Sequence, residues 1–208
     1  MNLVTITSPQ SVASEAYRTL RTNLYFAALE KPFKTLVLTA PTQHDDKSNA
    51  VANLAVVIAQ TDKRVIVVDA DLRHPNQHKI FGLKNDAGLS NMIGSSNAFV
   101  RMPLQDTSVT GLQILTSGPT PDVPSDALNS RKMSQLIATL REQADLIIFD
   151  TPATAIASDA AILASQTDAT LLVLTSGKTR REQAQAAKDL LIRAKARLLG
   201  AVMLNAKT

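Results

Sequence analysis

Residues 35–60 read TLVLTAPTQHDDKSNAVANLAVVIAQ, and this stretch decides the fold. The run 35–39 is apolar and of strand length, and a polar loop follows it over residues 40–46. From Lys47 to Gln60, apolar side chains recur on one face of a helix. The stretch therefore predicts a buried strand, a loop and a helix that begins at Lys47.

The same alternation continues along the chain. Short apolar runs predict further strands at 65–69, 113–115, 146–150, 170–174 and 199–204. Helical periodicity predicts helices at 11–30, 130–143, 157–165 and 180–195. Strands that alternate with helices are typical of βαβ units. We therefore expect an α/β fold, a parallel sheet with helices on both faces, and a single domain over residues 1–208.

Composition excludes several classes of protein. No apolar run approaches the length of a membrane span, and the amino terminus lacks the pattern of a signal peptide, so a cytoplasmic location is expected. The chain has no cysteine, hence no disulfide framework. Aromatic residues make up 3%, too few for nucleic-acid stacking platforms, and no nucleic-acid partner is expected. The basic residues of the last third indicate either a solvated helix face or a surface that meets anionic lipid or nucleic acid.

Acidic residues follow two of the predicted strands. Asp69 is the last residue of the run 65–69, and Asp71 follows two positions later. Asp150 is the last residue of the run 146–150. Ligands of open α/β sheets bind at the carboxyl ends of strands, and carboxylates there suit Mg²⁺ or a general base. A single Asp after a strand is more often a helix cap. Two such strand ends beside a Lys-Ser helix start favour the ligand site.

The loop before Lys47 and Ser48 has the position of a phosphate-binding loop but not its composition. Such a loop turns its backbone N–H groups toward phosphate, which requires glycine. The chain has seven glycines, and the first is Gly82. Asp46 also brings negative charge toward a polyphosphate. A metal site formed by His44, Asp45 and Asp46 is the less favoured alternative to a polar solvated loop.

Nearly the whole chain resembles the cytoplasmic domain of bacterial tyrosine kinases, the capsule and exopolysaccharide autokinases related to MinD and ParA. The segments that carry the resemblance are EAYRTLR (15–21), VIVVDADLRHP (65–75), GPTPDVPS (118–125), LIIFDTP (146–152) and GAVMLN (200–205).

The resemblance implies a P-loop NTPase fold, a nucleotide-binding-type core over residues 34–208 and an oligomerisation helix within residues 1–33. The implied roles are catalytic for Lys47, Asp69 and Asp71; metal-binding for Ser48, Asp69 and Asp150; and oligomer-forming for Glu15, Arg18 and Arg21. Mg-ATP or Mg-ADP would be held by residues 44–49, namely His44, Asp45, Asp46, Lys47, Ser48 and Asn49, and by Asn205. The implied partners are further copies of the chain and the cytoplasmic tail of a membrane polysaccharide co-polymerase, which would place the domain near the membrane.

Departures from the family pattern decide the functional prediction. The family loop has the form PGEGKST, whereas His44 and Asp46 stand here in place of glycines and Asn49 in place of a threonine. The only tyrosines, Tyr17 and Tyr25, lie on the first predicted helix and not in a carboxyl-terminal cluster. We therefore expect a kinase-like domain with weak or no ATP binding that acts as a regulatory or assembly partner. An active Mg-ATP-dependent autokinase and a MinD/ParA-like positioning ATPase are the alternatives.

Overall fold

A computed structural model describes residues 3–43, 46–94 and 102–206. The helices of this part are α1 (Val4–Thr7), α2 (Val12–Glu30), α3 (Lys47–Ala59), α4 (Gln77–Phe81), α5 (Leu89–Gly94), α6 (Pro124–Leu128), α7 (Arg131–Gln143), α8 (Asp159–Gln166) and α9 (Arg181–Arg193). The strands are β1 (Thr35–Thr39), β2 (Val65–Asp69), β3 (Gln105–Asp106), β4 (Leu112–Leu115), β5 (Leu146–Asp150), β6 (Ala169–Thr175) and β7 (Leu198–Leu204).

The strands form one sheet in the order β3-β4-β2-β5-β1-β6-β7. All neighbouring pairs are parallel except β3 with β4, which is antiparallel. The predicted parallel α/β sheet is therefore confirmed for its main body. The short antiparallel edge strand β3 was not predicted, because two polar residues carry no strand periodicity.

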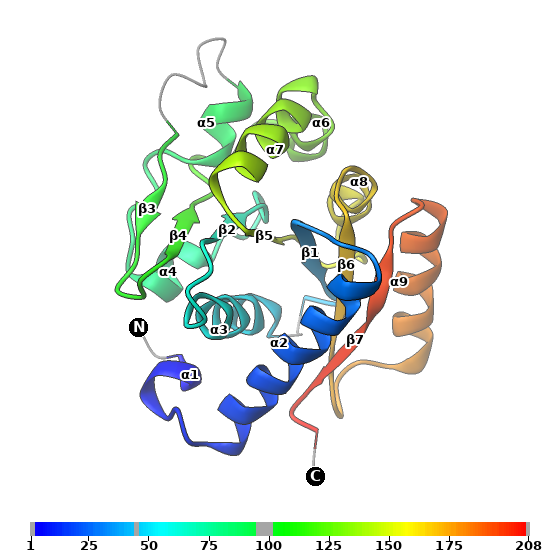
Figure 1. Cartoon of the computed structure of the whole chain (residues 1–208). Coiled ribbons are helices and arrows are strands. Elements are labelled where there is room, and N and C mark those ends of the chain that lie inside the picture. Colours follow the sequence, from blue (N-terminus) through cyan, green and yellow to red (C-terminus); the bar gives the residue numbers. More distant parts are fainter. Residues whose placement is uncertain (1–2, 44–45, 95–101, 207–208) are drawn as a thin grey trace.

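Helices cover both faces of the sheet (Figure 1). Alternate residues of each strand point to opposite faces, so Leu36 and Leu38 of β1 pack in a cluster with α2 and α3, whereas Val37 packs in a cluster with α5 and α7. The α3 helix is buried nearly all round, since Val51, Leu54 and their neighbours lie between the sheet and α2. Within the described ranges, no helix has the length and apolar character needed to cross a membrane.

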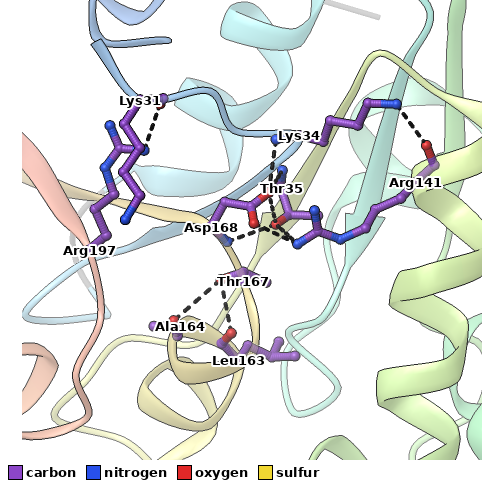
Figure 2. A network of polar contacts seen from close by, with 9 residues as sticks. All are labelled: Lys31, Lys34, Thr35, Arg141, Leu163, Ala164, Thr167, Asp168 and Arg197. Atoms are coloured by element: carbon purple, nitrogen blue, oxygen red, sulfur yellow. Dashed lines mark hydrogen bonds and ion pairs between the residues drawn. The ribbon is translucent and has the colours of Figure 1, made fainter.

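A polar network ties the amino ends of the central strands together, as Figure 2 shows. The Asp168 carboxylate accepts hydrogen bonds from the Lys34 and Thr35 backbone N–H groups, at 2.9 and 3.0 Å, and from the Thr35 hydroxyl. Arg141 of α7 donates to the other oxygen at 2.7 Å. Partial burial acts to raise the pKa of Asp168, but these hydrogen bonds outweigh it and lower the pKa to about 2. The network joins β1, β6 and α7 at the amino edge of the sheet.

Candidate phosphate and metal site

The strand-end acids meet at the carboxyl edge of the sheet. Asp69 of β2 pairs in register with Asp150 of β5, and Asp150 lies beside Leu38 of β1. Both carboxylates are fully buried. Asp69, Asp150 and the loop after β1 therefore lie together at the carboxyl edge of the three central strands, as the sequence predicted.

Lys47 occupies the first position of α3, and its side chain reaches the buried Asp150. Its ammonium group donates to Oδ1 of Asp150, and only 5% of the residue is exposed. A buried ammonium needs a buried counter-ion, and Asp150 provides it. Lys47 is therefore engaged inside the protein and would have to exchange this partner to bind a phosphate.

Asp69 lies beside Asp150 but has different partners. Its Oδ2 accepts hydrogen bonds from the backbone N–H groups of Asn76 and Gln77, at 3.0 and 2.9 Å. Its Oδ1 is buried without a hydrogen-bond partner among the described residues. Burial, reinforced by the charge of Asp150, raises the pKa of Asp69 to about 8. Burial beside a second acid therefore makes the charged form of Asp69 harder to keep than that of an exposed carboxylate.

Asp71 and Ser48 line a cavity of about 690 Å³ above these buried acids. The Asp71 carboxylate accepts a hydrogen bond from the His74 backbone N–H at 2.9 Å, and burial raises its pKa. Arg73, which also lines the cavity, forms an ion pair with Asp159 at the start of α8. The cavity is therefore bordered by both acidic and basic groups.

The oxygen donors fit Mg²⁺ only in part. Within the described part of the chain, no three His, Cys, Asp or Glu residues are grouped closely enough to hold a metal ion. Mg²⁺ usually keeps several waters and binds one or two carboxylates together with substrate phosphates. The unpartnered Oδ1 of Asp69 and the cavity position of Ser48 and Asp71 suit an ion of that kind. They do not form a cage that would hold the ion by protein groups alone.

The loop before α3 has an ordinary backbone where the structure describes it. Asp46 has φ −74°, and its carboxylate accepts a hydrogen bond from the Asn49 side chain at 2.8 Å. In the described loop positions, 40–43 and 46, no residue has a positive φ. His44 and Asp45, two of the predicted cofactor residues, lie outside the described residues. The described part of the loop thus lacks the conformation that a phosphate nest requires.

Asn205 borders a second cavity, of about 680 Å³, between α2, the start of α3 and the end of β7. It has φ 54°, a left-handed conformation that Asn tolerates better than most residues. Asp46 and Asn49 line the same cavity, as does Tyr17, whose pKa is raised to about 12 by burial and the nearby charge of Asp46. Asp46 also lines the first cavity, so this residue borders both cavities.

The predicted oligomerisation residues all lie on α2, and two of them have partners within the domain. Arg18 forms an ion pair with Glu15 at 2.8 Å within the helix. Arg21 donates to the backbone carbonyl of Val57 on α3, also at 2.8 Å. Glu15 is exposed, whereas Arg18 is half-buried and also donates to the backbone carbonyl of Pro9, and Arg21 joins α2 to α3.

Sequence reasoning missed Gln77 and Asp159. Gln77 is fully buried beside Asp69 and Asp150, and Asp159 is fully buried beneath Arg73. Gln and Asp are usually exposed, so neither residue carries a local sequence signal of burial. Only the tertiary fold reveals their part in the site.

Comparisons with known proteins agree with this architecture. A family model for ParA, described as NUBPL iron-transfer P-loop NTPase, matches residues 46–206. The fold and the Lys47–Asp150 site define a P-loop NTPase of the ParA type. Cell division ATPase MinD of Pyrococcus furiosus, at 23% identity and a TM-score of 0.69, shares this fold.

Closer relatives define the family. Tyrosine-protein kinase YwqD of Bacillus subtilis is 41% identical over 97% of this chain and 85% of its own length. The putative tyrosine-protein kinase CapB of Staphylococcus aureus is 35% identical over 94% of this chain and 85% of its own length. The kinase domain of Escherichia coli tyrosine kinase ETK superposes with a TM-score of 0.90 at 32% identity, covering 100% of this chain and 83% of that one. The chain belongs to the bacterial tyrosine-protein kinase family.

Proposed function

We propose that this domain is a regulatory or assembly partner within the tyrosine-kinase family and binds nucleotide weakly or not at all. The observation that carries the proposal is the position of the acidic residue Asp46, which lines both the cavity of Ser48 and Asp71 and the cavity of Asn205. A nucleotide with its base near Asn205 and its phosphates near Ser48 would have to pass this charge.

The size of the penalty supports the proposal. Two unit charges about 5 Å apart repel by about 3 kcal/mol at an effective dielectric of 20. Such a penalty weakens binding by about two orders of magnitude. Lys47, the cation that would offset the phosphate charge, is already paired with Asp150. The charge of Asp46 and the existing partner of Lys47 therefore both act against a polyphosphate.

An active Mg-ATP-dependent autokinase is the second candidate. It is favoured by the arrangement of Lys47, Asp69 and Asp150 at one sheet edge, with Ser48 and Asp71 in the cavity above them. An active tyrosine-protein kinase would need a lysine for the phosphates and oxygen ligands for the metal ion, and these residues could supply both. The two candidates differ in one measurable quantity, the affinity for nucleotide.

Calorimetric titration with Mg-ADP and Mg-ATP at physiological salt tests the proposal. We expect dissociation constants well above the micromolar range. Micromolar or tighter binding would favour the autokinase instead, and incorporation of phosphate into Tyr17 or Tyr25 would then be measured.

Self-association through the outer face of α2 is the second part of the proposal. Glu15, Arg18, Thr22, Tyr25 and Leu29 follow the alternating spacing of three and four residues that lines up one helix face. Tyr25 and Leu29 are 61% and 64% exposed. The charged first half of this face and its apolar second half both suit contact with a neighbouring copy. The further partner that we propose is the cytoplasmic tail of a membrane polysaccharide co-polymerase.

A further inference from the structure

Gln77 connects three parts of the candidate site although it lies outside every motif of the sequence. Its side-chain amide nitrogen donates to Oδ2 of Asp150 at 2.7 Å and to the backbone carbonyl of Ser48 at 3.0 Å. Its backbone N–H donates to Asp69. The residue begins α4. Its side chain joins the end of β5 to the start of α3, and its backbone N–H adds the end of β2.

The two oxygens of Asp150 are therefore both occupied. Lys47 donates to Oδ1, and Gln77 donates to Oδ2. A buried carboxylate is stable only when such donors or a metal ion surround it. Here an ammonium group and an amide are the donors to its two oxygens.

The orientation of the amide points to the role of its NH₂ group. The NH₂ group faces two acceptors, whereas Oε1 of Gln77 is buried without a hydrogen-bond partner among the described residues. The reverse orientation would place the carbonyl oxygen of Gln77 against the carboxylate and the Ser48 carbonyl, where it could accept nothing. The side chain keeps this orientation although Oε1 of Gln77 stays buried and unpaired, which is unfavourable. The two hydrogen bonds that its NH₂ group donates must therefore determine the orientation.

We propose that Gln77 is a positioning residue whose amide takes the place of a divalent cation between Asp150 and the Ser48 main chain. The partial positive charge of the NH₂ group meets the carboxylate and the carbonyl oxygen, which are the kinds of ligand that Mg²⁺ prefers. Because the amide occupies this position, we expect the affinity of the domain for a free divalent ion to be low. This inference concerns the ion alone and does not depend on whether nucleotide binds.

The experiment compares the full chain with Gln77→Leu in EDTA and in millimolar Mg²⁺, with thermal unfolding as the measurement. The leucine is close in size but donates no hydrogen bond, so we expect a lower Tm in EDTA and a clear rise in Tm with Mg²⁺. The wild-type Tm should hardly respond to Mg²⁺. Gln60→Leu, at the exposed carboxyl end of α3, is the matched control and should behave as the wild type.

A titration with Mn²⁺, followed by electron paramagnetic resonance, gives a direct readout. We expect at least tenfold tighter binding of Mn²⁺ by Gln77→Leu than by the wild type. Equal affinities, or equal responses of Tm, would overturn the proposal. If Gln77→Leu folds only in Mg²⁺ the proposal is supported, and if it does not fold, Gln77→Asn is measured by the same criteria. Failure of both variants to fold in Mg²⁺ would show that an ion cannot replace the amide, which also overturns it.

Discussion

The guanidinium group of Arg73 donates a hydrogen bond to each carboxylate oxygen of Asp159, with Nε–Oδ2 and Nη2–Oδ1 distances of 2.9 and 3.2 Å. Asp159 is fully buried at the first turn of α8, whereas Arg73 follows β2 at the rim of the cavity. The pair therefore joins the acidic loop after β2 to the segment after β5. It fixes the position of the loop that carries Asp71.

Replacement of Arg73 by alanine should leave the Asp159 carboxylate buried and unpaired. We expect a loss of about 3 kcal/mol in the free energy of unfolding, measured with urea. Arg64→Ala is the control, because Arg64 and Asp145 form an exposed pair and should contribute less than about 1 kcal/mol. Similar losses for both variants would contradict the structural role of the Arg73 pair.

Restoring glycine to the phosphate loop should restore nucleotide binding. The double substitution His44→Gly and Asp46→Gly returns backbone freedom and removes one negative charge near the phosphates, so we expect at least a tenfold gain in affinity for Mg-ADP by calorimetry. Asp86→Asn removes an exposed charge elsewhere and should change nothing. An unchanged affinity in the double variant would place the defect outside this loop.

Self-association should require the outer face of α2. Tyr25→Glu combined with Leu29→Glu places two charges on its apolar half, and we expect light scattering to show a monomer where the wild type is an oligomer. Ile192→Glu changes an exposed apolar residue of α9 and should leave the oligomer intact. A wild-type chain that is monomeric at every concentration would refute the assembly hypothesis.

The charged half of α2 needs a separate variant, Arg18→Ala combined with Arg21→Ala. We expect this variant to lose the oligomer, since both arginines are family oligomerisation residues by resemblance. Arg21 also bonds the Val57 carbonyl, so circular dichroism must first establish that the variant is folded. A folded double variant that still forms the wild-type oligomer would exclude the two arginines from the interface.

Acid should destabilise the domain through Asp168. The pKa of this carboxylate is lowered from 3.8 to about 2 in the folded state, so the unfolded state binds the proton first. Its stabilising contribution is complete above about pH 4 and is lost as the pH falls toward 2. Asp168→Asn should therefore flatten the pH dependence of stability in that interval, whereas Asp106→Asn, an exposed carboxylate on β3, should not. An unchanged slope for Asp168→Asn would show that the network does not favour the ionised form.

The sequence predicted the central part of the fold well because its signals are local. The apolar runs of β1, β2 and β5 begin and end where expected, and Ser130 caps α7 by accepting from the Met133 backbone N–H. The short helices α4 and α6 were not predicted, since five residues are too few to show a helical period.

For the candidate site, the sequence predicted which acids end the strands but not what binds them. Lys47 is distant from Asp150 along the chain, and their ion pair follows from the pairing of β1 with β5. Gln77 and Asp159 acquire their roles from tertiary contacts alone. The resemblance implied that Glu15, Arg18 and Arg21 form the oligomer, which stays a prediction, and the contact of Arg21 with α3 could not be read from the sequence.

The central position of β1 has a consequence for how the chain is made. Its two neighbours, β5 and β6, lie far toward the carboxyl terminus, and the Thr151 hydroxyl bonds the Leu38 carbonyl across 113 residues. Strand pairings of such long range form slowly. During synthesis, β1 leaves the ribosome before β5 and β6, and we expect its apolar edges to stay open until β5 emerges. We therefore expect the nascent chain to be prone to aggregation until β5 is made, and any truncation before β5 removes the partner that completes the middle of the sheet.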